Sequence, residues 1–204
     1  MQKVDFKKTL KHLYNPPPKF VLVEVPLMRF VMVDGHGDPN TSQSYQDAIE
    51  ALYAVAYKTK FISKKEFGQD YTVPPLEGLW WAEDMEAFTT SLDKSQWDWT
   101  MMIMTPDWIS RAVFDEAVSR VRSSKNPVAL DLVRLEDYSE GLAAQVMYVG
   151  AYADEGPAIR ALHDFIDQSG HLLNGKHHEI YLSDPRRVAP EKLKTVIRQP
   201  VRPR

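Results

Sequence analysis

Apolar and polar residues alternate along several short stretches of the chain, and a period of two predicts β-strands. In other stretches apolar residues recur every three or four positions, which is the period of an amphipathic helix. The predicted strands are residues 20–25, 29–33, 71–73, 76–82, 97–104, 128–135, 143–152 and 177–183, and the predicted helices are residues 4–14, 42–58, 105–121 and 156–166.

Capping residues support three of these helices. Ser42 or Ser44 can accept the first backbone N–H groups of one helix, and Thr105 followed by Pro106 is a typical opening of another. Gly156 followed by proline opens the last. Three prolines at positions 16–18 end the first helix, so residues 1–18 are expected to form an arm that precedes the domain.

The two halves of the chain contain similar segments. VMVDG at residues 31–35 resembles VMYVG at 146–150, and LWWAED at 79–84 corresponds to EIYLSD at 179–184. This repetition predicts an α+β fold of duplicated strand–helix–strand–strand repeats about a pseudo-twofold axis. We expect an antiparallel sheet with helices on one side and a ligand groove between the halves. The expected domain spans residues 19–204, with halves at about 19–90 and 95–185.

Composition excludes several classes of protein. None of the 204 residues is cysteine, so disulfides, cysteine-ligated metals and a cysteine nucleophile are ruled out. The net charge of −3 does not favour direct nucleic-acid binding. Residues 186–204 hold seven basic residues and one acid, and we expect a solvated basic C-terminal tail there. No apolar run resembles a membrane span or a signal peptide, so a cytoplasmic protein without membrane contact is expected. The sequence indicates no oligomeric state.

Glu179 is the strongest candidate for chemistry. It lies in the predicted strand at residues 177–183, where His177, Glu179 and Tyr181 share one face and Ile180 lies on the other. We expect the Ile180 face to be the helix-covered core and the Glu179 face to border the groove. A carboxylate withdrawn from water there would have a raised pKa and act as a general base or as the counter-ion of a cationic ligand.

Aromatic residues are frequent, with 5 Trp, 9 Tyr and 8 Phe. Large rings can fill a core, but they also build cages for flat or cationic ligands. Of the adjacent pair Trp80 and Trp81, the first is expected in the core, because Trp81 corresponds to Tyr181 in the repeat. The candidate ligand-binding residues are Trp81, Trp99, Tyr148 and Tyr181, followed by Trp80, Trp97, Tyr71 and Tyr152.

The histidines do not predict a metal site. His177 with Glu179, or Asp34 with His36 and Asp38, could chelate an ion, but neither set has the spacing of a known site. We therefore expect no metal and no cofactor.

Four separated motifs resemble, in the same order, those of the GyrI-like small-molecule-binding family. They are LEGLWWAED at 76–84, WDWTMMIMTPDWI at 97–109, VGAY at 149–152 with the helix that follows, and HHEIYLSDPRR at 177–187 running on to KLK at 192–194. The resemblance implies a duplicated fold with a groove and, in many members, a glutamate of the last strand in an aromatic pocket. Glu179 matches that glutamate. Some members carry a DNA-binding helix-turn-helix, but only about 18 residues precede the first predicted strand here, which argues against a transcription regulator.

A stand-alone branch of this family hydrolyses cyclopropane-bearing DNA alkylators of the yatakemycin and CC-1065 type, using an aromatic cage. Resemblance to that branch implies that Glu179 activates water while the rings hold a flat polycyclic substrate. Two alternatives stay open. The same pocket could bind amphipathic or cationic drugs without turnover, or the chain could be a protein-binding module that engages an enzyme such as gyrase through its acidic body.

Overall fold

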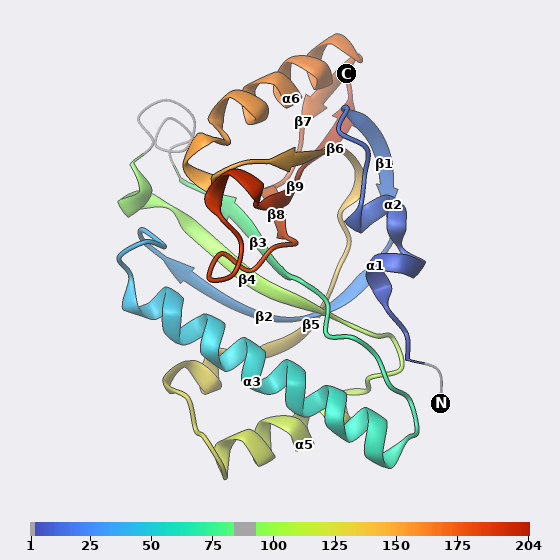
Figure 1. Ribbon diagram of the computed structural model, residues 1–204, viewed down its shortest axis with the longest axis vertical. Helices are drawn as coiled ribbons and strands as arrows, with labels where there is room; N and C mark the ends of the chain where they lie inside the picture. The colour runs from blue at the N-terminus through green and yellow to red at the C-terminus, as the bar shows by residue number, and fades with distance from the viewer. Residues whose placement is uncertain (1–2, 84–92) are drawn as a thin grey trace. The chain divides into compact units, whose positions relative to one another are not determined.

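The computed structural model describes residues 3–83 and 93–204, which form an α+β fold (Figure 1). The α-helices are α1 (Phe6–Thr9), α2 (Lys11–Tyr14), α3 (Gln43–Glu66), α5 (Arg111–Arg122) and α6 (Gly156–Gln168). The strands are β1 (Val21–Val25), β2 (Met28–His36), β3 (Leu76–Trp81), β4 (Asp98–Thr105), β5 (Arg134–Tyr138), β6 (Gly141–Val149), β7 (His171–Leu173), β8 (His177–Tyr181) and β9 (Lys194–Pro203). Four 3₁₀ turns join them in the described residues: η1 (Lys94–Gln96), η2 (Val128–Leu132), η3 (Tyr152–Asp154) and η4 (Pro190–Lys192).

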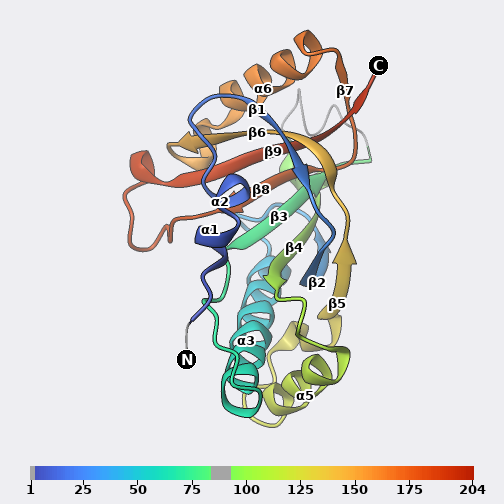
Figure 2. The ribbon, with the colours of Figure 1, turned by 90° about the vertical axis from the view of Figure 1, so that its right-hand side faces the viewer.

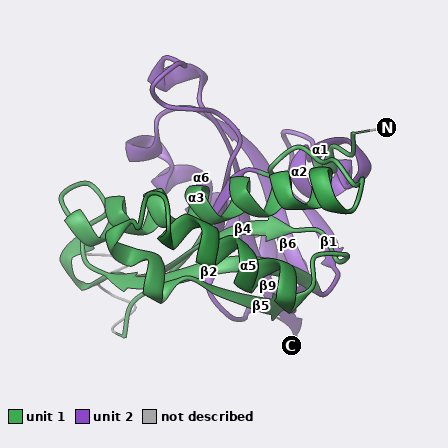
Figure 3. Cartoon of the chain, turned by 90° about the horizontal axis from the view of Figure 1, so that it is seen from below, with its two compact units in different colours: residues 1–6, 28–74, 78–138 green, residues 7–27, 75–77, 139–204 purple. Residues whose placement is uncertain are grey.

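The chain divides into two compact units (Figure 3). Unit 1 contains residues 1–6, 28–74 and 78–138, and unit 2 contains residues 7–27, 75–77 and 139–204. The division differs from the predicted halves, because β1 belongs to unit 2 and α5 to unit 1. The order strand, helix, strand, strand occurs in each, as β2–α3–β3–β4 and, with the short β7 added, as β6–α6–β8–β9. The duplication about a pseudo-twofold axis and the groove between halves stay predictions.

Unit 1 is built on the strand order β3-β4-β2-β5. Strands β2 and β4 pair antiparallel with Val31 opposite Ile103, and both side chains are buried. Helix α3 packs on these two strands, and α5 and η2 pack against α3. Alternation along the strands therefore supplies one apolar face of the core and the helices supply the other.

Helix α3 begins where the sequence predicts and continues about two turns further. The Ser42 hydroxyl accepts the Tyr45 N–H, as an N-cap does, and the helix ends at Glu66 rather than near residue 58. The extra turns bury polar residues that find partners, since the Lys60 ammonium lies 2.9 Å from Asp70 and the Ser63 hydroxyl donates to the Gln69 carbonyl. Apolar periodicity alone does not detect such a segment.

Unit 2 has the strand order β1-β6-β9-β8, with β7 paired to β9. Helix α6 packs on β6 and β9 (Figure 2). Its Leu162 and Ile166 contact Val146 of β6 and Ile197 of β9, and all four side chains are buried. The predicted opening of this helix at Gly156 is confirmed.

The prediction of a solvated tail at residues 186–204 is wrong from Leu193 to Val201, whereas Arg186 and Arg187 are exposed. Residues 194–203 form β9, which pairs with β6, β7 and β8 and is buried along most of its length. Arg198 in the middle of this strand is only 2% exposed. Charge counting suggested solvent exposure because it ignores the acidic partner that a buried arginine can find elsewhere in the fold.

Several smaller predictions are also corrected. Helix α5 begins at Arg111, with Ser110 as its cap, because the residues after Pro106 form a turn that buries Ile109. Residues 128–132 are the 3₁₀ turn η2, and the strand follows at 134–138. The stretch 71–73 makes only an isolated bridge between Tyr71 and Val4. Strand β6 ends at Val149, so residue 152 is not in it.

No helix within residues 3–83 and 93–204 is long and apolar enough to cross a membrane. Asp84, the last residue of the first family motif, lies outside the described residues.

Candidate functional site

Glu179 lies at the centre of a polar cluster in unit 2. The Tyr181 hydroxyl donates a hydrogen bond to one Glu179 carboxylate oxygen at 2.7 Å, and His177 Nε2 lies 3.2 Å from the other. The side chain of Glu179 is 15% exposed and that of His177 is 3% exposed. The period of two along β8 brings these three residues to one face, as predicted.

A ring and a second acid complete the cluster. Tyr152 of η3 packs edge-on against Tyr181, with the ring centroids 5.5 Å apart. Glu155, which is 3% exposed, precedes α6 and is among the groups that lower the pKa of Glu179. Sequence reasoning missed Glu155. The signal that could have found it is an acid placed just before Gly156 and Pro157, at the start of a helix.

The pKa of Glu179 is lowered, whereas the sequence argument expected it to be raised. Burial alone would raise the pKa of this carboxyl, but the hydrogen bonds from His177, Tyr181 and Glu155 and the proximity of His177 outweigh burial. Glu179 is therefore held as a carboxylate. It is well suited to face positive charge and is a weaker base than a simply desolvated glutamate.

Helix α6 covers the face of the sheet that bears Glu179. Glu179 is directly opposite Ile197 of β9, so both point to the same face, and Ile197 packs against α6. The expectation that the Ile180 face is the helix-covered one is thus wrong for α6. The reason is register, because pairing with β9 fixes which face of β8 meets the helix.

Two further polar groups lie on this side of unit 2. The pKa of His163 on α6 is lowered by burial and by His177. His163 Nε2 and the hydroxyl of Thr195, which is opposite Tyr181, are buried and have no hydrogen-bond partner among the described residues. Buried polar atoms are usually paired, so two unpaired ones on the same side of unit 2 as Glu179 are typical of a ligand-binding site.

The opposite face of β8 carries a closed ionic network. His178 Nε2 lies 3.0 Å from Glu77, and His178 Nδ1 lies 2.9 Å from Glu140. Arg198 donates to Glu140 at 3.1 Å, and the Tyr14 hydroxyl donates to Glu77 at 2.8 Å. Every one of these side chains is buried.

Both ring nitrogens of His178 face carboxylates, which identifies the ring as an imidazolium. Burial alone would lower its pKa, but Glu140 and Glu77 raise the pKa of His178 to about 9. In turn the charges of His178 and Arg198 overcome burial and lower the pKa of Glu140 to about 2. Burial and Glu77 raise the pKa of Tyr14.

The predicted tryptophans lie in unit 1. Trp80 and Trp97 pack edge-on at 5.8 Å, and Tyr45 of α3 contacts Trp80 at 6.2 Å and Trp99 at 5.2 Å between ring centroids. Trp80 and Trp99 are 5% and 1% exposed, whereas Trp81 and Trp97 are half-buried. Trp80 is a core residue, as predicted, and Tyr45 is a ring that the strand pattern could not connect to this cluster.

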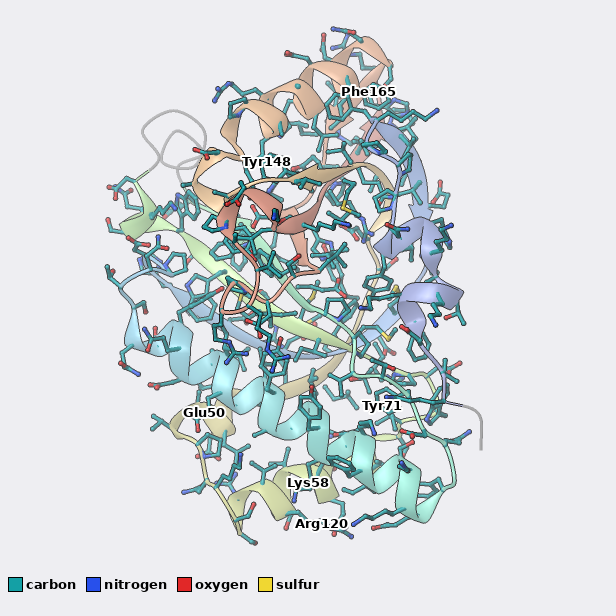
Figure 4. The ribbon with its side chains drawn as sticks, viewed as in Figure 1. Glu50, Lys58, Tyr71, Arg120, Tyr148 and Phe165 are labelled. Atoms are coloured by element: carbon teal, nitrogen blue, oxygen red, sulfur yellow. The ribbon has the colours of Figure 1, made fainter. Side chains whose placement is uncertain are left out.

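The remaining two predicted residues differ in their surroundings (Figure 4). Tyr148 of β6 packs at the edge of the α6 core and donates a hydrogen bond to the Ala151 carbonyl at 3.1 Å. Tyr71 follows α3 and is 2% exposed, packed against Phe6 and Trp108. Burial raises the pKa of Tyr71, so its hydroxyl stays protonated at every physiological pH. Its role in ligand binding stays a prediction, and the position it holds is one of core packing.

Other candidate positions have structural partners. Asp34 accepts from Thr100 at 2.6 Å and pairs with Arg134, and His36 lies 2.8 Å from Asp98. Within the described part of the chain no three histidine, aspartate or glutamate side chains gather as a metal site. A cavity of about 300 Å³ lies on unit 1 and contains none of the predicted site residues. It is lined by Lys58, Phe61, Ile62, Lys65 and Arg120.

The antiparallel α+β fold and the carboxylate set among tyrosines define a small-molecule-binding protein. The GyrI-like small molecule binding domain matches residues 18–202, and the chain belongs to the GyrI-like family. No curated protein matches the sequence.

Solved structures support the assignment. An uncharacterized conserved protein from Listeria innocua is 40% identical, with a TM-score of 0.91 over 98% of this chain and 100% of its own. Two structures described as hydrolases from the same organism are each 38% identical over 98% of this chain and 100% of their own, with TM-scores of 0.86 and 0.88. At these identities and coverages the likeness extends to the whole chain.

Proposed function

We propose that this GyrI-like protein hydrolyses cyclopropane-bearing DNA alkylators of the yatakemycin and CC-1065 type, with Glu179 as the group that activates water. The observation that carries the proposal is the Glu179 carboxylate, held by His177 and by Tyr181, whose ring packs against Tyr152. Two relatives that match the whole chain are called hydrolases, which favours turnover over binding alone.

The proposed reaction adds one water molecule to the cyclopropane-bearing substrate. The water oxygen attacks the cyclopropane CH₂, the strained C–C bond breaks, and its electron pair moves through the dienone to the oxygen, which becomes a phenolate. Glu179 takes the proton that the attacking water loses and later releases it to solvent, and the phenolate takes a proton from solvent, so that the base is regenerated. General-base assistance of this kind contributes about 10²–10⁴-fold.

The carboxylate and the rings have separate roles in this proposal. Positive character grows at the attacked carbon, and a fixed anion with aromatic faces stabilises it. In unit 2 we assign ring contacts to Tyr152 and Tyr181. In unit 1, Trp81 and Trp97 are half-buried, whereas the core encloses Trp80 and Trp99.

The second candidate function is binding of amphipathic or cationic drugs without turnover. A specific observation favours it, since the lowered pKa of Glu179 makes the carboxylate a stable counter-ion and a modest base. Both functions use Glu179, so the position of the residue does not separate them.

Absorbance-monitored turnover of a cyclopropane-dienone alkylator separates the two functions. We expect the wild-type protein to complete many turnovers and Glu179→Gln to lose about 10²–10⁴-fold in rate while still binding the compound. Glu24→Gln, an exposed glutamate of β1, is the matched control and should behave as wild type. Tight binding without turnover by the wild-type protein would contradict the hydrolase proposal and support drug binding as the function.

A further inference from the structure

The cavity of about 300 Å³ on unit 1 lies where helices α3 and α5 pack against each other (Figure 1). Lys58, Phe61, Ile62 and Lys65 line it from α3, and Arg120 lines it from α5 (Figure 4). The last three α3 residues follow Lys58 by three, four and seven positions, so the helical period places all four on one face. The cavity is therefore built within one unit and shares no residue with the Glu179 cluster.

The apolar wall of this cavity combines a buried and an exposed side chain. Ile62 is 2% exposed and belongs to a core cluster, whereas the ring of Phe61 is 48% exposed. The Lys60 ammonium lies 4.7 Å from the centroid of that ring, which a cation–π contact helps to hold in place. A ligand with an apolar body would cover ring surface that water now contacts.

The lysines of α3 differ in their partners. Lys60 and Lys64 lie outside the lining and pair with Asp70 at 2.9 and 3.2 Å. Within residues 3–83 and 93–204, Lys58 and Lys65 have no acid at ion-pair distance. The two lysines that line the cavity are therefore the ones whose charge is not already matched.

Arg120 contributes less free charge than these lysines. Its guanidinium lies 2.8 Å from Glu66 and 2.6 Å from the i−4 residue Glu116. Counting these two acids with the three cations of the lining leaves one positive charge in excess. A ligand that matches this charge carries a single negative charge.

We propose that this cavity binds a small amphipathic organic anion, such as an aromatic sulfonate or carboxylate. The apolar body lies against Phe61 and Ile62, and the acidic group faces the ammonium groups of Lys58 and Lys65. Lysine stems can add apolar contacts while their charged ends donate hydrogen bonds to the anion. The volume is at the lower end of ligand pockets and suits a small aromatic body. This site is separate from the proposed hydrolytic site.

Titration of the full chain with naphthalene-2-sulfonate tests this proposal. Naphthalene-2-sulfonamide has the same fused rings without the charge, so the difference in affinity isolates the negative charge. We expect the sulfonate to bind about tenfold more tightly at low salt, with most of that difference lost at about 0.5 M salt. Backbone amide resonances in an NMR titration should shift along residues 58–65 and at Arg120.

Lysine variants of α3 assign the charge to its residues. Lys58→Gln and Lys65→Gln should each weaken sulfonate binding about threefold and leave sulfonamide binding unchanged. Lys64→Gln is the matched control, because it removes the same charge from a neighbouring position that does not line the cavity. It should bind the sulfonate as the wild-type protein does.

Two exposed rings of α3 form a second matched pair. Phe61→Ala should weaken binding of both naphthalene compounds about threefold or more, because the apolar wall is lost. Tyr57 is also 48% exposed but does not line the cavity, so Tyr57→Ala should bind both compounds normally. Circular dichroism would confirm that the variants fold.

Three results would overturn the proposal: no saturable binding of the sulfonate, equal affinity for the sulfonate and the sulfonamide, or equal weakening by Lys64→Gln and Lys58→Gln. Amide shifts centred outside α3 and α5 would also contradict it. Glu179→Gln should bind the sulfonate as the wild-type protein does. Failure of the anion site and failure of the proposed hydrolase are therefore distinguishable.

Discussion

His177 and His178 are neighbours in β8, yet they point into clusters of opposite character. On the His178 face, the imidazolium of His178 pairs with the carboxylates of Glu77 and Glu140. Glu140 also pairs with the guanidinium of Arg198. On the His177 face, the acid Glu155 influences the carboxyl of Glu179, and Tyr181 donates a hydrogen bond to Glu179. The first cluster is balanced in charge, and the second carries an excess of negative charge.

This difference separates a stabilising network from a binding site. Buried charges are tolerated where every member is paired, and the His178 network meets that condition. The Glu179 cluster holds two largely buried acids, Glu155 and Glu179, and the buried Nε2 of His163 on α6 has no hydrogen-bond partner in the described part of the chain. Such an arrangement costs stability and is typical of positions retained for function. The two faces of one strand should therefore respond differently to the same substitution.

Glu140→Gln should produce the largest loss of stability. It removes one negative charge from between His178 and Arg198 and leaves two buried bases with one acid. Breaking a buried ion network in this way costs about 3–5 kcal/mol of unfolding free energy. Urea denaturation measures the loss. Asp184→Asn, at an exposed ion pair with Arg186, is the control and should change little. A small loss of unfolding free energy in Glu140→Gln would mean that the ionic network around His178 contributes little to stability.

Raising the pH should also weaken this ionic network, because His178 loses its proton and its positive charge. The pKa of His178 is raised to about 9, so its contribution is complete below about pH 6.5 and is lost as the pH rises through 9. The loss is roughly 3 kcal/mol by linkage. Glu140 acts oppositely, because its pKa is lowered to about 2 and its contribution disappears as the pH falls from about 4.5 through 2.

Urea denaturation between pH 5.5 and pH 9.5 checks the alkaline limb. His178→Gln should be less stable at pH 6 and should lack most of the decline toward pH 9.5. An equally steep decline in that variant would assign the effect to another group.

Tyr181→Phe should have a moderate effect on the site face. It removes the hydroxyl that donates to Glu179 at 2.7 Å but keeps the ring against Tyr152. We expect a loss of about 1 kcal/mol in unfolding free energy and a rise in the pKa of Glu179. Carboxyl resonances in a ¹³C NMR titration measure that pKa. Tyr57→Phe, on the exposed face of α3, should change neither quantity.

Glu179→Gln should change stability least, by less than about 1 kcal/mol in either direction. A glutamine can still accept the hydrogen bond from Tyr181, and the variant removes one of the two acids in this cluster. Glu140→Gln and Glu179→Gln thus form a matched pair of variants. The first should lose stability, and the second should lose activity. Equal destabilisation by both would remove the distinction between the two clusters.

Local pattern in the sequence determined much of the fold. The period of two in residues 177–181 placed His177, Glu179 and Tyr181 on one face, and Ser42 and Gly156 marked the starts of α3 and α6. The family motifs identified the class of protein. These features are visible in one sequence because they depend on neighbours within one turn or one strand.

Tertiary structure alone decided the rest. Arg198 is buried because Glu140, 58 positions away, receives its charge, and Tyr14 reaches Glu77 across 63 positions. Glu155 enters the site because η3 and α6 return the chain to β8, and the register of β8 with β9 decides which face α6 covers. Periodicity and charge counting describe what a residue can do locally. The partner that changes a charge from a solvated one to a buried one is fixed only when distant segments pack together.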